Sequence, residues 1–221
     1  MTVDQQQQAA QALAKELIEA GLALQSQGRH DEALRKFEEA WMSCPESALA
    51  ACLCGAEWSE RGDAQRAEAA FSHAVTLSPQ WPMPRYLLGQ LHWGRQQLAQ
   101  AVLAWQPLLQ QQGTYFATMA EACLAMSAQE WPIALAKFDQ AIAQIHDNAP
   151  LRAEATRMKA RVLEAMQITT EDVTSPSVAP TSATAAQTQA HMSPAPNNSN
   201  AADDALTAQH VLLTGYQQHL H

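Results

Sequence analysis

Basic residues are scarce in this chain, and none follows Arg161. The 221 residues include 13 Lys and Arg against 22 Asp and Glu, which gives a formal net charge of −9. A surplus of negative charge repels the phosphates of nucleic acids and of anionic lipids. The composition therefore predicts that neither nucleic acid nor a membrane surface is a partner.

Long apolar runs are missing as well. The chain begins MTVDQQQQAAQALAKELIEAG, where Asp4 and a glutamine run replace the basic and apolar parts of a secretory signal. No run approaches the roughly 18 apolar residues of a membrane helix. The four cysteines are too few and too clustered for a disulfide scaffold. Since 47% of the residues are hydrophobic, we expect a cytoplasmic, reduced protein with a folded core.

Two pairs of potential metal ligands occur, and both are weak. Cys52 and Cys54 are two residues apart, or about 200° around a helix, so they do not point at one small ion. His219 and His221 could chelate a divalent cation, but they have no third ligand. The sequence predicts no metal site and no cofactor.

Catalytic motifs are equally hard to find. Cys123 could be paired with His92 or His146 as nucleophile and base. A buried, inert thiol is the better interpretation of a cysteine at a small-residue position. We therefore predict that the protein is not an enzyme and has no catalytic residue.

A set of positions recurs with a period close to 34 residues. Apolar residues three and four apart on both halves of each unit indicate two helices per unit. A breaker closes the first three units, at Pro45, Pro79 and Gly113. The recurring columns are Gly21, Gly55 and Gly89; Ala33, Ala67, Ala101 and Ala134; Phe37, Phe71, Trp105 and Phe138; and Ala40, Ala74, Leu108 and Ala141.

The glycine column predicts how the two helices of a unit pack. Glycine inside a helix costs about 1 kcal/mol of stability relative to alanine. Its recurrence at the same position of successive units therefore indicates that the two helices approach so closely there that a side chain would block them. The aromatic column fills the space beside it. Proline then ends the second helix and turns the chain into the next unit.

This pattern resembles the tetratricopeptide repeat, through AGLAL…EALRKF…P in the first unit and CGAEW…AEAAF…P in the second. The third unit, LLGQLHWG…AVLAW, lacks the proline, and the fourth, AEACLAM…ALAKF, lacks the glycine and is one residue shorter. The resemblance covers about residues 9 to 150. It implies an all-α superhelix of about four helix-turn-helix repeats, at about 14–47, 48–81, 82–115 and 116–149.

The flanking segments differ from the repeats in composition. Residues 1–8 are expected to be a disordered, glutamine-rich N-terminus, and residues 150–168 a capping helix that completes an array over 9–168. Residues 169–201 are rich in Ser, Thr, Ala and Pro and predict a disordered linker. Residues 202–221 are expected to form a short apolar C-terminal helix, with Leu206, Val211, Leu212, Leu213, Tyr216 and Leu220.

The resemblance implies a concave groove, lined by the first helix of each repeat, that binds extended or helical peptides. In the fourth unit the register around Phe116, Met119 and Cys123 is not settled. Some of the apolar residues at these positions belong to the core instead. The aligned groove positions are Lys15, Ile18, Leu22 and Gln25; Leu49, Cys52, Ala56 and Ser59; and Met83, Tyr86, Gln90 and Trp93.

The groove residues also indicate the kind of ligand. Chaperone-docking members of the family clamp a terminal carboxylate with Lys, Asn and Arg, and here only Lys15 fits that pattern. An apolar groove favours a client with hydrophobic anchors. We expect Met83, Tyr86 and Trp93 to contact it.

Several roles agree with such a groove. We interpret the chain as a non-enzymatic protein–protein interaction module, a cytoplasmic assembly adaptor or chaperone. A weaker similarity, through AEACLAM…RMKARVLEAM, is to the translocator chaperones of bacterial type III secretion systems, although those usually have three repeats and an N-terminal helical extension. A self-associating scaffold, such as a homodimer, is a further alternative. The C-terminal segment could occupy the groove itself or bind a second partner.

Overall fold

The computed structural model describes residues 2–145 and 148–174, which form nine helices and contain no strand. The prediction of an all-α fold is confirmed. None of the described helices is both long and apolar enough to cross a membrane. The helices are α1 (Val3–Ser26), α2 (His30–Ser43), α3 (Ala48–Glu60), α4 (Ala64–Leu77), α5 (Pro82–Gly94), α6 (Leu98–Leu109), α7 (Tyr115–Ser127), α8 (Trp131–Gln144) and α9 (Ala149–Thr174).

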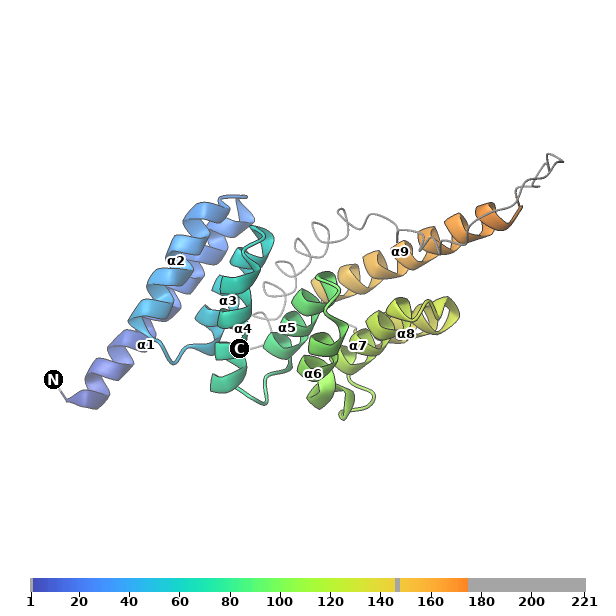
Figure 1. Cartoon of the computed structure of the whole chain (residues 1–221). Coiled ribbons are helices and arrows are strands. Elements are labelled where there is room, and N and C mark those ends of the chain that lie inside the picture. The colour runs from blue at the N-terminus through green and yellow to red at the C-terminus, as the bar shows by residue number, and fades with distance from the viewer. Residues whose placement is uncertain (1, 146–147, 175–221) are drawn as a thin grey trace, which may run out of the picture.

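The first eight helices form four pairs that follow one another along the array, and α9 closes its C-terminal end (Figure 1). Within a pair the two helices are joined by a tight turn. One residue of each turn has a positive φ: 74° at Gly28, 75° at Gly62, 60° at Gln96 and 58° at Gln129. The same left-handed turn therefore closes all four pairs, although only the first two contain the glycine that this conformation favours.

The glycine and aromatic columns meet inside the pairs. A Cβ atom built on Gly21 would lie 2.4 Å from Phe37, one on Gly55 2.8 Å from Phe71, and one on Gly89 2.1 Å from Trp105. These aromatic rings and that of Phe138 are fully buried. The predicted close approach of the two helices therefore holds in the three repeats that carry the glycine.

Helix α3 is covered on every side. All residues from Ala50 to Ser59 are buried, although this segment carries Glu57. A helix that is apolar all round belongs inside a structure. The second pair therefore forms the best-protected part of the N-terminal half of the array.

The N-terminus is more ordered than expected. Helix α1 begins at Val3, so the predicted disorder of residues 1–8 is wrong for residues 3–8. The reason is a capping box: Gln5 N–H donates to Thr2 Oγ1 at 3.4 Å, and Thr2 N–H donates to Gln5 Oε1 at 3.0 Å. Glutamine and alanine, which are good helix formers, fill the turns that follow.

The capping helix is also longer than expected. Helix α9 packs on α8 and buries Leu151, Ala155, Met158 and Val162, which are three or four residues apart and so share one face of the helix. It continues to Thr174, so the predicted linker at 169–201 is wrong for residues 169–174. The predictions for 175–201 and for the segment 202–221 lie outside the described residues.

Candidate protein-binding groove

Most of the predicted groove residues have little access to solvent. Lys15 is exposed, and Leu22, Leu49 and Trp93 are partly buried. That any of the twelve contacts a client stays a prediction. Eight of them are buried in this structure: Ile18, Gln25, Cys52, Ala56, Ser59, Met83, Tyr86 and Gln90.

The predicted aromatic anchors on α5 are held by neighbouring helices. Tyr86 is fully buried, with its ring centroid 6.4 Å from that of Trp105 and 5.4 Å from that of Phe116. Its hydroxyl accepts a hydrogen bond from Gln90 Nε2 at 2.7 Å. Trp93 Nε1–H donates to Ser127 Oγ at 2.7 Å. These contacts give both rings a packing role in the array.

Helix α9 also reaches α7 and α5 through polar side chains. The Tyr115 hydroxyl donates to the Leu151 carbonyl at 2.9 Å, which ties α7 to α9. Glu154 of α9 is only 3% exposed and pairs with Arg157 at 2.6 Å. Burial raises the pKa of the Glu154 carboxyl above its usual value, although Arg157 and Gln90 act to lower it. The capping helix therefore occupies the C-terminal part of the array with a buried polar contact to α5.

An open groove remains at the other end of the array, with a volume of about 490 Å³. It lies between α1 and the turn that connects α2 to α3. Its floor is apolar, and its rim is polar with charges of both signs. The floor consists of Ala14, Ile18, Leu22 and Leu49, and the rim of Gln11, Lys15, Glu19, Cys44, Glu46 and Ser47. We call these ten residues the N-terminal groove.

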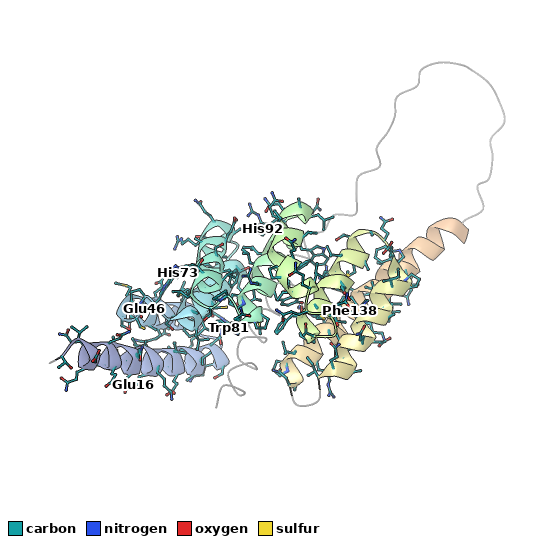
Figure 2. The ribbon with its side chains drawn as sticks, turned by 90° about the horizontal axis from the view of Figure 1, so that it is seen from below. Glu16, Glu46, His73, Trp81, His92 and Phe138 are labelled. Atoms are coloured by element: carbon teal, nitrogen blue, oxygen red, sulfur yellow. The ribbon has the colours of Figure 1, made fainter. Side chains whose placement is uncertain are left out.

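The sequence explains how the groove forms. Gln11, Lys15, Ile18 and Leu22 are three and four residues apart, so they share one face of α1. The opposite wall is held in place where Ser47 Oγ accepts a hydrogen bond from Ala50 N–H at 3.2 Å and starts α3. In Figure 2, Glu46 of this turn and Glu16 of α1 lie on opposite sides of α1.

A side-chain contact joins the two walls: Gln7 Nε2 donates to Glu46 Oε2 at 3.3 Å. On the rim, Lys15 and Glu19 are 4.0 Å apart and well exposed. Exposed pairs of this kind contribute about 0–1 kcal/mol, so both side chains can turn toward a ligand at little cost.

Four of the twelve predicted residues come together in the N-terminal groove: Lys15, Ile18, Leu22 and Leu49. The α2–α3 turn, with Cys44, Glu46 and Ser47, was missed. The only sequence signal for it is Pro45, which ends a repeat and turns the chain back toward α1. The family pattern assigns the groove to first helices alone, so it does not point to this turn.

The cysteines differ sharply in access. Cys44 is partly exposed on the groove rim, whereas Cys52, Cys54 and Cys123 are buried. Burial raises the pKa of each of these three thiols, which therefore stay protonated at neutral pH. Reagents also cannot reach the three buried thiols, so Cys44 is the accessible position among the four.

One cluster of the described residues has a spacing that would suit a metal ion. Potential ligand atoms of His30, Glu57 and Glu60 lie within 4.8 Å of one another. The buried Glu57 carboxylate, however, pairs with Arg61 at 2.7 Å and accepts a hydrogen bond from Gln25 at 3.1 Å. Arg61 already supplies the positive charge that an ion would bring.

No protein-family model matches the sequence, and no curated protein matches it either. Among solved structures, the MamA RS-1 ArsTM double mutant is 17% identical, with a TM-score of 0.49 over 72% of this chain and 97% of that one. A crystal structure of MamA is 17% identical, with a TM-score of 0.47 over 68% and 96%. Another MamA structure is 14% identical, with a TM-score of 0.49 over 76% and 98%.

The geometry of the chain itself defines its fold. Four helical pairs share one left-handed turn, and three of them share a glycine against an aromatic ring. The spacing of these features is that of the repeat family that the sequence resembles. The chain folds as an array of four helical pairs similar to tetratricopeptide repeats, closed by a C-terminal capping helix.

Proposed function

We propose that this chain is a non-enzymatic scaffold that binds an apolar segment of a partner protein in the N-terminal groove. The observation that carries the proposal is an open groove of about 490 Å³ whose floor consists of Ala14, Ile18, Leu22 and Leu49. Apolar side chains that remain partly open to solvent, as Leu22 and Leu49 do, favour contact with another apolar surface.

The size of the groove limits what it holds. It accommodates a few large side chains of a partner rather than a whole domain. Burying one Leu, Ile, Phe or Met side chain contributes roughly 1.5–3 kcal/mol. Two or three such anchors contribute roughly 3–9 kcal/mol before the cost of ordering the partner is subtracted. Micromolar binding requires about 8.2 kcal/mol, so it is the upper limit for the groove by itself.

The rim adds selectivity. Its three charged residues, Lys15, Glu19 and Glu46, sum to a net charge of only −1. A strongly charged peptide therefore gains little binding energy here, whereas a neutral apolar peptide gains more because it can bury its side chains. An adaptor or a chaperone that keeps an apolar client in solution, including one of the type III translocator kind, would use the groove in this way.

The test is photo-crosslinking in the native host. A photoreactive amino acid at Leu22 should form an adduct with one partner protein, and the same group at Leu103, which is 67% exposed on α6, should not. Adding Leu49→Glu should abolish the adduct at position 22. Glutamate in the first turn of α3 suits the helix dipole, so the array should stay folded. Equal adducts at positions 22 and 103, or an adduct that survives Leu49→Glu, would contradict the proposal.

A further inference from the structure

We propose that the N-terminal groove of the free protein is occupied by residues 202–221 of the same chain, which a client must displace. This inference rests on the proposed function, because it names the resident ligand of the same groove. It makes the C-terminal segment a built-in competitor.

The chemistry of the segment matches that of the groove. Leu206, Leu213 and Leu220 are seven residues apart, so they fall on one side of any helix that the segment forms. No Lys, Arg, Asp or Glu occurs from 205 to 221. Apart from Asp203 and Asp204 at its start, the segment is therefore a ligand without acidic or basic residues, and its large apolar side chains suit a groove with an apolar floor and a rim of mixed charge.

The connection is long enough. Helices that pack against each other lie about 8–10 Å apart, and the 26 residues of α9 make it about 39 Å long. Four steps of about 10 Å, one for each first helix passed on the way from α9 to α1, and the full length of α9 amount to about 80 Å. The 30 residues between Thr174 and Ala205 (204 − 174) reach about 100 Å when extended. The segment can therefore enter the groove of its own molecule, even though α9 carries the start of the connection away from the array (Figure 1).

The tether also favours this occupant over a free peptide. Linked ligands meet their site at effective concentrations of up to the millimolar range, and less when the linker is stretched. A contact too weak to hold a separate peptide can then fill the groove most of the time. A segment from a second copy of the chain lacks this tether. The two copies also repel each other, because both carry a net negative charge.

Cys44 provides a direct test in the full-length protein. It lies on the groove rim and is the accessible cysteine among the four. Cysteine is introduced at Leu206, Leu213 or Leu220, one position at a time, and a mild oxidant is added. We expect at least one of the three to form an intramolecular disulfide with Cys44, identified by peptide mapping.

The matched control keeps the productive cysteine and changes the other two of Leu206, Leu213 and Leu220 to Ser, so that the tether is the same and the apolar anchors are removed. The productive position should form the disulfide about tenfold faster or more, and Cys44→Ser should abolish the product. A rate equal to that of the serine control, or disulfides found only between two molecules, would overturn the inference. The changes at positions 206, 213 and 220 lie outside the array, and Cys44→Ser replaces a partly exposed side chain by one of similar size, so misfolding of the repeats does not confuse the result.

The two proposals fail separately. If the disulfide is absent while the photo-crosslinker at Leu22 still captures a partner, the groove binds clients and only the resident ligand is wrong. If the disulfide forms but no partner is captured, the segment fills the groove and the client-binding proposal fails.

Discussion

The indole of Trp105 leaves no room for a side chain on Gly89. A Cβ atom at that position would lie 2.1 Å from Trp105 Nε1, far inside van der Waals contact. The ring cannot easily move away, because Nε1–H donates a hydrogen bond to the Tyr86 carbonyl at 3.0 Å. A hydrogen bond thus fixes the aromatic ring against the glycine that precedes it in the repeat.

We expect Gly89→Ala to lower the free energy of unfolding by about 1–3 kcal/mol or more, the cost of overpacking a core, despite the higher helix propensity of alanine. The control is Gly94→Ala at the end of the same helix, where no atom of the described residues lies within 4 Å of the added Cβ. That change should be neutral or stabilise by about 0.4–1 kcal/mol. Urea unfolding of the two variants gives both values. Equal effects would show that the Gly89–Trp105 contact is not tight.

The turns provide a second prediction. Gln96 has a φ of 60°, a conformation that costs a residue with a Cβ about 1–2 kcal/mol. Gln96→Gly should therefore stabilise the array by roughly 0.5–1 kcal/mol, although glycine usually weakens a folded state. Gln97→Gly, one residue later at a φ of −89°, should destabilise it. A loss of stability in the Gln96→Gly variant would contradict the role assigned to this turn.

Tyr86 can be tested as packing or as an anchor. Because its side chain is fully buried beside Trp105 and Phe116, we expect Tyr86→Ala to cost about 3–5 kcal/mol of stability, as for other large core truncations. Phe71→Ala should cost a similar amount. Thermal unfolding and client binding are measured together. A variant with an unchanged melting temperature and an affinity weaker by about 2 kcal/mol would instead mark Tyr86 as an anchor.

The buried Glu154 predicts how stability depends on pH. Burial raises the pKa of its carboxyl, so the folded state holds the proton more tightly than the unfolded state. This contribution is most favourable below the ordinary glutamate pKa of about 4.3 and is lost as the pH rises through the raised value. Glu154→Gln should remove this loss of stability with rising pH and increase the free energy of unfolding at neutral pH. Glu164→Gln, an exposed change on the same helix, is the control. Chemical unfolding from pH 4 to pH 8 compares them.

Deletion of residues 201–221 tests whether the C-terminal segment competes with the client for the groove. If the segment fills the groove, the truncated protein should bind its client more tightly, because no resident ligand has to leave. Titration of both forms with the captured client measures the change. Equal or weaker binding would exclude competition by the segment.

The repeat itself could be predicted from the sequence, because its determinants are local. Gly55 and Phe71 are 16 residues apart in one unit, and their contact follows from the recurrence of both columns. The ordered N-terminus had a local signal as well. Thr2 and Gln5 have the spacing of a capping box, but the glutamine run that follows was interpreted as disorder.

The groove could be predicted only in part. Lys15, Ile18 and Leu22 follow from the repeat register, whereas Glu46 joins them only once the chain has turned after Pro45. At the other end, apolar residues at first-helix positions have the same pattern whether they bind a ligand or pack inside. The hydrogen bond from Tyr115 to Leu151 spans 36 residues and brings α9 toward α5 and α7, and no local pattern shows it.

Helix α3 is covered on all sides, whereas α1 has a neighbouring pair on one side only. In an array where helices contact mainly their neighbours in sequence, the structure forms from local contacts, and the end units open more readily than inner ones. The N-terminal groove therefore belongs to the part of the molecule that exchanges its amide hydrogens early. A ligand that holds α1 against the α2–α3 turn must slow that exchange, so occupancy of the groove can be followed through the backbone of α1 without labelling the ligand.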